Sequence, residues 1–237
     1  MTVLILGAVM FGVLFAGFSA LGVWQVRRLA WKQELIRQVD ARIHAAPVAA
    51  PPPDQVVTRQ ADQYRRVVVS GRFDHQRETL VKAVTDLGPG YWVLTPLVTE
   101  RGFTVLINRG FVPPERQKPA DRAAGQVEGP VTVVGLLRLT EPGGGFLRAN
   151  DPAGDRWFSR DVTAIARARG EAGPVASYFI DADATPNPGG WPRGGLTVVR
   201  FANSHLIYAV TWFGLALMSG AGFVLFWREE KRRRAMR

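Results

Sequence analysis

Two long uncharged stretches, residues 1–26 and 201–227, dominate the hydrophobic pattern of the chain. Each exceeds the roughly 20 apolar residues that a helix needs to cross a bilayer. A cleaved signal peptide is the alternative for the first stretch, but no basic segment precedes it and no A-x-A cleavage site ends it. We therefore predict two transmembrane helices, 1–26 and 201–227.

Small residues recur at every fourth position within both stretches. They are Gly12, Ala16 and Ala20 in the first stretch, and Ala216 and Gly220 in the second. This spacing allows membrane helices to approach each other closely. We predict that the two helices touch, with Gly12 and Ala16 facing Ala216 and Gly220.

Beyond the first stretch, helical spacing of apolar residues continues from Trp24 to residue 46 and stops at Pro47. Ala and Pro make up nearly all of residues 45–53, which predicts a stiff linker that contributes nothing to a core. Residues 27–60 are therefore assigned to a juxtamembrane helix and an Ala/Pro linker. The basic residues just after the first stretch are expected to extend toward the membrane surface.

The middle of the chain changes to short runs of Val, Leu, Ile and aromatic residues between Gly, Pro and Asp. The predicted strands are 65–73, 79–84, 91–99, 103–109, 131–139 and 176–180. One short helix begins at the N-cap Asp161 and ends near Gly170, and residues 143–145 and 186–195 form loops. We predict a two-span membrane protein whose domain at 61–200 is α+β and antiparallel β-rich, either a sandwich or a partly open barrel.

The chain carries a formal charge of +10. Part of this charge lies in the tail, residues 228–237, which contains six Lys or Arg and two Glu. A basic tail directly after a span predicts a cytoplasmic location. Both termini would then be cytoplasmic and the central domain periplasmic. Arg27, Arg28 and Lys32 argue for the opposite orientation, but long domains are translocated largely regardless of charge. Because the basic tail is explained by membrane topology, the positive net charge does not indicate that the protein binds nucleic acid.

Few residues in the central domain suggest chemistry. The chain has no Cys, which excludes disulfides, thiolate metal sites and cysteine nucleophiles. It contains no G-x-S-x-G or H-E-x-x-H motif and no phosphate-binding glycine loop. We expect His75 to be an exposed residue at a strand end and the scattered basic residues to form a solvated face. No catalytic residues are predicted.

The start of the second stretch is different, because it contains several polar and aromatic side chains. At helical spacing, His205, Tyr208 and Trp212 share one face. An ionisable side chain within a span suggests a functional site, and neutral imidazole is the commonest metal ligand among side chains. The alternative is an interfacial belt of aromatic residues with His205 among the lipid headgroups. The residues alone leave both interpretations open.

Several segments spread along the chain carry a further signal. They are LGVWQVRRLAWKQELI, YRRVVVSGRFDH, VLINRGFVP, VEGPVTVVGLLRLTE, YFIDAD and NSHLIYAVTWFGL. In this order they resemble the Surf-one (surfeit locus protein one) family of cytochrome c oxidase assembly factors, and they cover nearly the whole chain. Each segment alone is a weak signal, but the ordered set is specific.

The resemblance implies an inner-membrane protein that assists the insertion of haem a into oxidase subunit I, with haem a synthase as a further partner. Bacterial members are similar to haem a carriers that use the His of the second span, which is His205 here. Trp24 and Gln25 match the boundary motif of the first span. The cofactor-binding residues that the resemblance implies are His205 as the axial iron ligand, with Tyr208, Trp212, Trp24 and Gln25 around it.

Two functions remain open on these grounds. The first is a haem-binding chaperone, in which Arg193 or Arg200 would pair with the acidic haem propionates. The second is a membrane scaffold that organises oxidase subunits or haem a synthase without binding haem. An enzyme is not expected.

Overall fold

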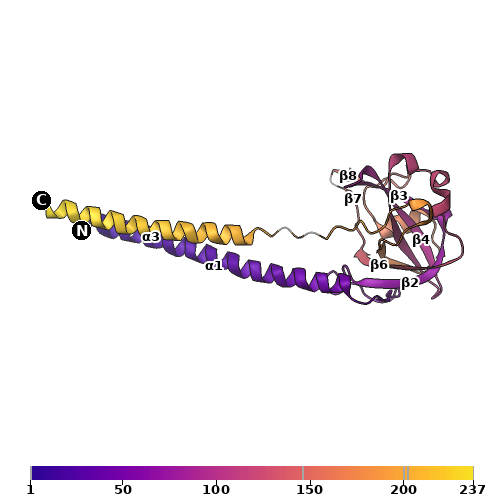
Figure 1. The fold of residues 1–237 in the computed structure, drawn as a ribbon, viewed down its shortest axis with the longest axis horizontal. Helices are drawn as coiled ribbons and strands as arrows, with labels where there is room; N and C mark the ends of the chain where they lie inside the picture. Colours follow the sequence, from indigo (N-terminus) through magenta and orange to yellow (C-terminus); the bar gives the residue numbers. More distant parts are fainter. Residues whose placement is uncertain (1, 146, 200, 202, 237) are drawn as a thin grey trace. The chain divides into compact units, whose positions relative to one another are not determined.

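The computed structural model describes residues 2–145, 147–199, 201 and 203–236, and it divides into two compact units. One unit contains Met1–Gln38 and Arg200–Arg237, and the other contains Val39–Val199. Figure 1 shows long helices in the first unit and a β-rich fold in the second. The predicted fold class, two apolar helices flanking a β-rich domain, is confirmed.

Two long helices, α1 (Thr2–His44) and α3 (His205–Ala235), are each long and apolar enough to cross a membrane. The helix α1 continues past residue 26 without a break, and α3 begins later than residue 201. Ser204 occupies the N-cap of α3, a position where short polar residues are favoured over helix interiors. His205 is therefore the first helical residue rather than a residue one turn inside the helix.

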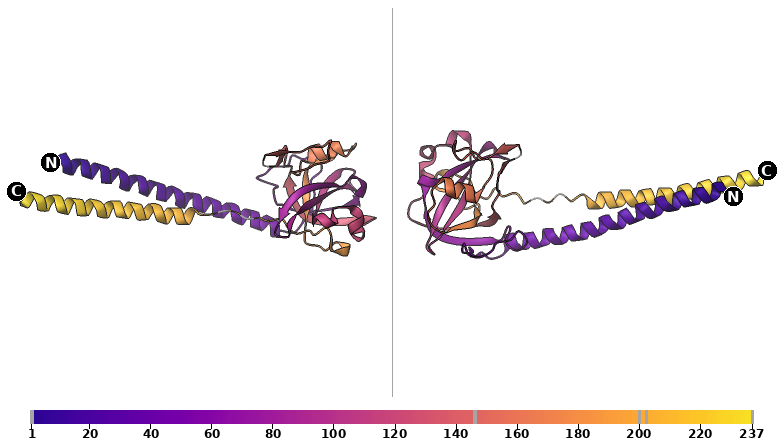
Figure 2. Two further views of the ribbon diagram at one scale, coloured as in Figure 1. Left: turned by 90° about the horizontal axis from the view of Figure 1, so that it is seen from above. Right: turned by 180° about the vertical axis from the view of Figure 1, so that it is seen from behind.

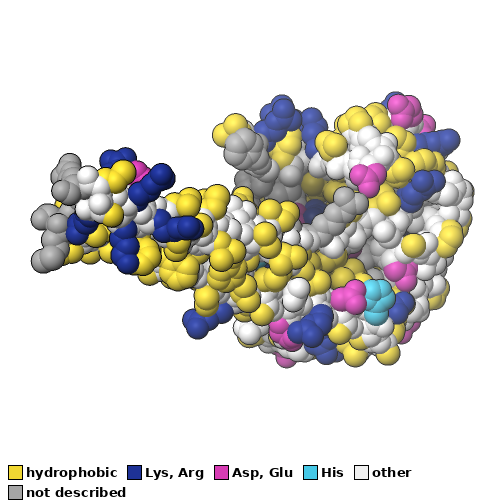
Figure 3. Space-filling view, turned by 60° about the vertical axis from the view of Figure 1, so that its left-hand side comes forward, with side chains coloured by type: hydrophobic (Ala, Val, Ile, Leu, Met, Phe, Trp, Pro, Cys, Tyr) yellow, Lys and Arg dark blue, Asp and Glu magenta, His cyan; other side chains and the backbone are white. Residues whose placement is uncertain are grey.

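The two helices lie side by side in antiparallel orientation, with both chain termini at the same end of the pair (Figures 1 and 2). Near that end, the rings of Phe11 and Phe223 lie 6.2 Å apart, and further along Phe18 stacks on Trp212 at 5.9 Å. The prediction that the helices touch is confirmed. Figure 3 shows that hydrophobic side chains cover most of the helical surface, while Lys and Arg gather near the termini.

The predicted interface is confirmed on α3 and wrong on α1. Ala216 is buried, and Gly220 lies against the ring of Phe15. Gly12, in contrast, has no described atom within 4 Å of its Cβ position, and Ala16 is exposed. The reason is that phenylalanine rings fill the interface, so the backbones do not need small residues at every fourth position to approach.

Large rings instead pack onto two other glycines of α1. A Cβ atom on Gly22 would lie 2.7 Å from the Phe213 ring, and one on Gly7 would overlap the Phe226 ring. Ser219 adds a hydrogen bond from its hydroxyl to the Phe11 carbonyl at 3.1 Å. Ring-on-glycine contacts therefore fix the spacing of the helices.

The second unit is built on one large sheet and a small hairpin. The strands are β1 (Val48–Ala49), β2 (Arg66–Phe73), β3 (Thr79–Thr85), β4 (Gly88–Thr99), β5 (Thr104–Val112), β6 (Pro130–Leu139), β7 (Gly144–Gly145), β8 (Arg148–Ala149) and β9 (Val175–Ala182). The order is β1-β2-β6-β9-β5-β4-β3, and an added β2–β4 pairing partly closes it into a barrel. The pairs β1–β2 and β5–β9 are parallel, and the others are antiparallel. All six predicted strands are present, and the two-residue strands were not predicted.

Short helices connect the strands. They are η1 (His75–Arg77), η2 (Pro114–Arg116), η3 (Pro119–Gly125), α2 (Val162–Ala168) and η4 (Pro188–Gly190). The predicted helix is confirmed as α2, because the Asp161 carboxylate accepts a hydrogen bond from the Ala164 amide and Gly170 takes a positive φ of 65°.

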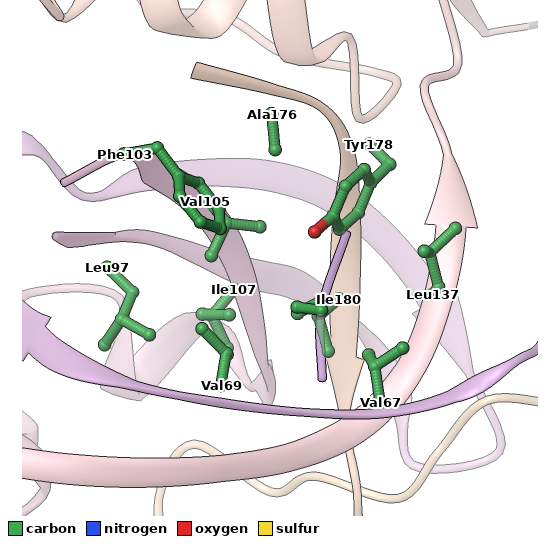
Figure 4. Close-up of a cluster of buried hydrophobic side chains, with 11 residues drawn as sticks. Val67, Val69, Leu97, Phe103, Val105, Ile107, Leu137, Ala176, Tyr178 and Ile180 are labelled. Atoms are coloured by element: carbon green, nitrogen blue, oxygen red, sulfur yellow. The ribbon is translucent and has the colours of Figure 1, made fainter. Parts of the chain in front are cut away.

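Two hydrophobic clusters lie on opposite faces of the central strands. One fills the interior of the barrel, with Val105, Ile107, Tyr178 and Ile180 pointing toward one another (Figure 4). The other lies beneath α2 and contains Leu106 and Trp157 among others. Strand β5 is consequently buried at every position, which explains its consecutive apolar residues Val105, Leu106 and Ile107.

The sequence predicts that the Ala/Pro segment is a stiff linker that contributes nothing to a core, and this prediction is wrong. Strand β1 pairs with β2, and Ala50 belongs to the barrel core. The Tyr178 hydroxyl donates a 2.7 Å hydrogen bond to the Pro51 carbonyl. Small side chains fit against the barrel, and proline still offers a carbonyl acceptor, so a segment of low hydrophobicity becomes part of the domain.

Candidate functional site

Two polar side chains, Gln25 and His205, join α1 and α3 at the end of the helix pair opposite the termini (Figure 1). Gln25 of α1 is only 8% exposed, and its Oε1 lies 2.8 Å from Nδ1 of His205. An amide oxygen only accepts hydrogen bonds, so Nδ1 is the donor, and in the neutral imidazole the lone pair is then on Nε2. No described residue makes a hydrogen bond to Nε2. The pair therefore brings Gln25 of the first apolar stretch and His205 of the second into direct contact.

The aromatic residues predicted for this site divide into two groups. Trp24, next to Gln25, and Tyr208, one turn after His205, are 53% and 52% exposed. Trp212 instead stacks on Phe18 with an interplanar angle of 24°. Trp24 and Tyr208 are thus available to a ligand, whereas Trp212 is engaged in packing the helices together.

Basic residues near the pair have identified neighbours. The Lys32 ammonium of α1 lies 5.1 Å from the ring centroid of Phe201. Arg28 lies 4.6 Å from the centroid of Trp31.

The two arginines that the sequence suggests as partners of the haem propionates are Arg193 and Arg200. The Arg193 guanidinium belongs to the β-rich unit and stacks on Trp191, while Arg200 lies outside the described residues.

A site that offers a single nitrogen ligand can hold some metal-containing groups but not others. Among the described residues, no cluster of three or more His, Asp or Glu is able to hold a free metal ion. Haem iron needs only an axial ligand from the protein, because the macrocycle supplies four nitrogens. A His with a fixed tautomer and an open Nε2 therefore fits haem better than a bare ion.

The central domain buries charged groups that sequence reasoning placed on a solvated face. Asp181 accepts hydrogen bonds from Asn108 and Arg138, both at 2.7 Å, from Thr197 at 2.9 Å, and from Arg160 at 3.2 Å. Burial lowers the pKa of Arg160, but Asp181 and Glu141 outweigh this effect and leave that pKa raised. The network borders a cavity of about 630 Å³.

A second set of buried charged side chains lies around Arg109 and Arg122. The expectation of an exposed His75 is also wrong, because His75 is half-buried and its Nε2 lies 2.9 Å from the Val127 carbonyl. The signal missed in the sequence was the position of Arg109 and Asp181 within strands that are rich in apolar residues. A residue at such a position is buried by the neighbouring strands and loops, whatever the polarity of its side chain.

Comparison with known proteins identifies the family. The model of the SURF1 family matches residues 12–217. The chain belongs to the SURF1 family. Human Surfeit locus protein 1 is 39% identical over 213 residues, covering 83% of this chain and 69% of the human protein. The SURF1-like protein of Monosiga brevicollis is 37% identical over 235 residues, covering 92% of this chain and 86% of that protein.

Membership of the SURF1 family confirms the resemblance drawn from the ordered segments. The first and last of those segments supply the Gln25–His205 pair. The VLINRGFVP and YFIDAD segments lie in the adjacent strands β5 and β9, where Asn108 donates to Asp181. Segments distant in the sequence are therefore brought together at two separate places.

Proposed function

We propose that this SURF1-family protein is an assembly factor for cytochrome c oxidase that binds haem a through His205 and assists its insertion into subunit I. Family membership supports the role in oxidase assembly. The observation that carries the haem proposal is the Gln25–His205 hydrogen bond, because it orients the imidazole and leaves Nε2 without a partner among the described residues.

In this proposal haem a is cargo rather than a resident cofactor. His205 donates the Nε2 lone pair to the iron, and Gln25 holds the ring by its Nδ1–H. Trp24 and Tyr208 offer exposed aromatic surface to the apolar macrocycle. A single nitrogen ligand on an open face favours release, which suits a carrier more than an enzyme. Subunit I and haem a synthase are the proposed protein partners.

The membrane orientation is part of the proposal. The antiparallel helices bring both termini to one end of the pair, and the basic tail favours the cytoplasm for that end. The central domain would then be periplasmic in a bacterial inner membrane. Alkaline phosphatase fused after the last residue should be inactive, and the same enzyme fused near Pro119 should be active. The reverse pattern of activity would overturn the orientation.

A visible spectrum tests the haem proposal directly. The full chain is co-expressed with the enzymes of haem a synthesis and purified in detergent. The wild type and His44→Ala, which removes an exposed histidine, should both show a Soret band, whereas His205→Ala should lose it. His205→Met should shift the band, since a thioether is a weaker axial donor. Haem retained by His205→Ala at wild-type stoichiometry would favour the scaffold function instead.

A further inference from the structure

The face of α1 that carries Gln25 continues past the contact with His205. Lys32 follows Gln25 by about two helical turns, so both side chains leave the same face of the helix. Leu29 lies between them on this face and is half-buried. Gln25 contacts His205, and Lys32 contacts Phe201 in the segment before α3. One face of α1 is therefore directed toward α3 and the residues that precede it.

Lys32 differs in burial from the other basic residues of this part of α1. It is half-buried, whereas Arg27, Arg28 and Arg37 are exposed. The Lys32 ammonium lies over the Phe201 ring but makes no hydrogen bond to any described residue. An ammonium on a ring face keeps its N–H donors for other acceptors, and a half-buried side chain remains accessible to a ligand.

Positive charge around Lys32 is not compensated by the protein. Residues 27–38 contain four Lys or Arg and a single acidic residue, Glu34. Glu34 accepts hydrogen bonds from Arg37 at 2.6 Å and from Gln38 at 3.0 Å. No described carboxylate forms a salt bridge with Lys32 or Arg28. The stretch of α1 that follows Gln25 therefore attracts anions.

An exposed strip of aromatic and basic side chains runs beside this face. Trp24, Arg28 and Trp31 follow one another at intervals of about one turn. The guanidinium carbon of Arg28 lies 4.6 Å from the centroid of the Trp31 ring, and both tryptophans are 53% exposed. Stacking occupies the face of a guanidinium and leaves the N–H groups at its edge free to bind a carboxylate.

The surroundings of His205 are consequently polarised along α1. Every residue from Thr2 to Gln25 is uncharged, whereas Arg28 and Lys32 follow within about two turns. The ligand that matches this pattern is flat and apolar and carries its acidic groups at one edge. Haem has this chemistry, because two propionate carboxylates leave one edge of an apolar macrocycle.

We propose that Lys32 and Arg28 bind the two propionates of the haem held by His205 and so fix the orientation of the macrocycle. This inference rests on the proposed haem function and adds the recognition of the acidic edge. The propionates accept charge-assisted hydrogen bonds from both side chains, and the opposite edge points along the uncharged part of α1. Both residues belong to the same unit as His205, in contrast to Arg193.

The test compares haem with its dimethyl ester, in which both carboxylates are esterified. The full chain in nonionic detergent is titrated with each compound, and the Soret band gives the two affinities. Lys32→Gln should bind haem about three- to tenfold more weakly than the wild type, and should bind the ester as the wild type does. The ratio of the two affinities isolates the contribution of the carboxylates, as in a double-mutant cycle.

Two further variants extend the comparison. Arg28→Gln should show the same selective loss as Lys32→Gln, and Lys32→Arg should retain most of the affinity for haem because the charge is kept. Phosphates of lipid headgroups offer similar oxygen acceptors to these cations. If lipid is their only ligand, haem and its ester will bind equally to the wild type and to Lys32→Gln, which would overturn the proposal.

Arg27→Gln is the matched control. Arg27 carries the same charge closer to Gln25, but a rotation of about 200° places it on the opposite face of α1. It should bind haem and the ester as the wild type does. An equal loss in Arg27→Gln and Lys32→Gln, or a loss in Lys32→Gln that is the same for haem and ester, would overturn the propionate assignment alone. A wild type without a Soret band would overturn the proposed function as well.

Discussion

The two units of this protein bury polar groups in different ways. In the β-rich unit, Asp181 is 4% exposed and accepts hydrogen bonds from four side chains. In the helical unit, His205 has one hydrogen-bonding partner among the described residues, Gln25, and one ring nitrogen left over. A fully satisfied group rigidifies the structure around it, whereas a partly satisfied one retains capacity for a ligand.

This difference separates structural polar groups from candidate sites. Arg109 is intermediate between the two, because two of its nitrogens are unused but are themselves buried. The number of unsatisfied atoms is more informative here than burial, since Asp181 and Arg109 are both buried. Substitutions that remove one partner at a time test the distinction.

The largest effect is expected for Asp181→Ala. Among the described carboxylates Arg138 then keeps only Glu141, at 3.5 Å, and its charge stays buried. Breaking a buried pair in this way costs about 3–5 kcal/mol of folding free energy. Urea unfolding followed by tryptophan fluorescence measures the loss. Asp151→Ala, which breaks an exposed pair, is the control and should be nearly neutral. Equal destabilisation by both variants would show that Asp181 has no special structural role.

The second-largest effect is expected on the packing of α1 against α3, which supports the Gln25–His205 pair. Gly22→Leu forces a side chain into the Phe213 ring and should cost about 1–3 kcal/mol of helix association. Cysteines replacing Phe15 and Gly220 report this, because the chain has no other cysteine. Crosslinking should fall in Gly22→Leu and persist in Gly12→Leu, where the Cβ position is open. Equal loss in both would place the interface elsewhere.

Gln25→Leu removes the acceptor that fixes the His205 ring while leaving the ligand itself. Partners of this kind typically contribute about 10–100-fold to metal affinity. Haem titration of the purified protein should show that loss, with a Soret band of altered position. Gln38→Leu changes an exposed glutamine of the same helix and should bind haem normally. Unchanged affinity in Gln25→Leu would mean that the hydrogen bond does not support ligation.

The smallest effect is expected for Tyr178→Phe, which removes a single neutral hydrogen bond to Pro51. The cost should be about 1 kcal/mol, well below that of Asp181→Ala. Limited proteolysis should also cut the Ala/Pro segment faster. Tyr91→Phe is the control, because no described residue bonds to its hydroxyl. If proteolysis is unchanged, the Tyr178 bond does not hold the segment on the barrel.

The sequence by itself determined the two apolar helices, the six long strands and the residues that are candidates for a haem site. The length of the two uncharged stretches predicted the two apolar helices. The short runs of apolar residues between turn-forming residues predicted the six long strands. The capping preference of Asp161 specified the start of α2. These features depend on local interactions and on hydrophobic periodicity, which are visible within one segment.

Only the tertiary structure decided which groups meet. The β2–β4 pairing that closes the barrel, the docking of Ala50 in its core, and the phenylalanine contacts that leave Gly12 open all join distant segments. The residue type of Arg109 and Asp181 did not reveal their burial, because burial depends on what covers a strand from both sides. Local propensity carries no information about those partners, so the unsatisfied atoms that mark candidate sites appear only once the chain has folded.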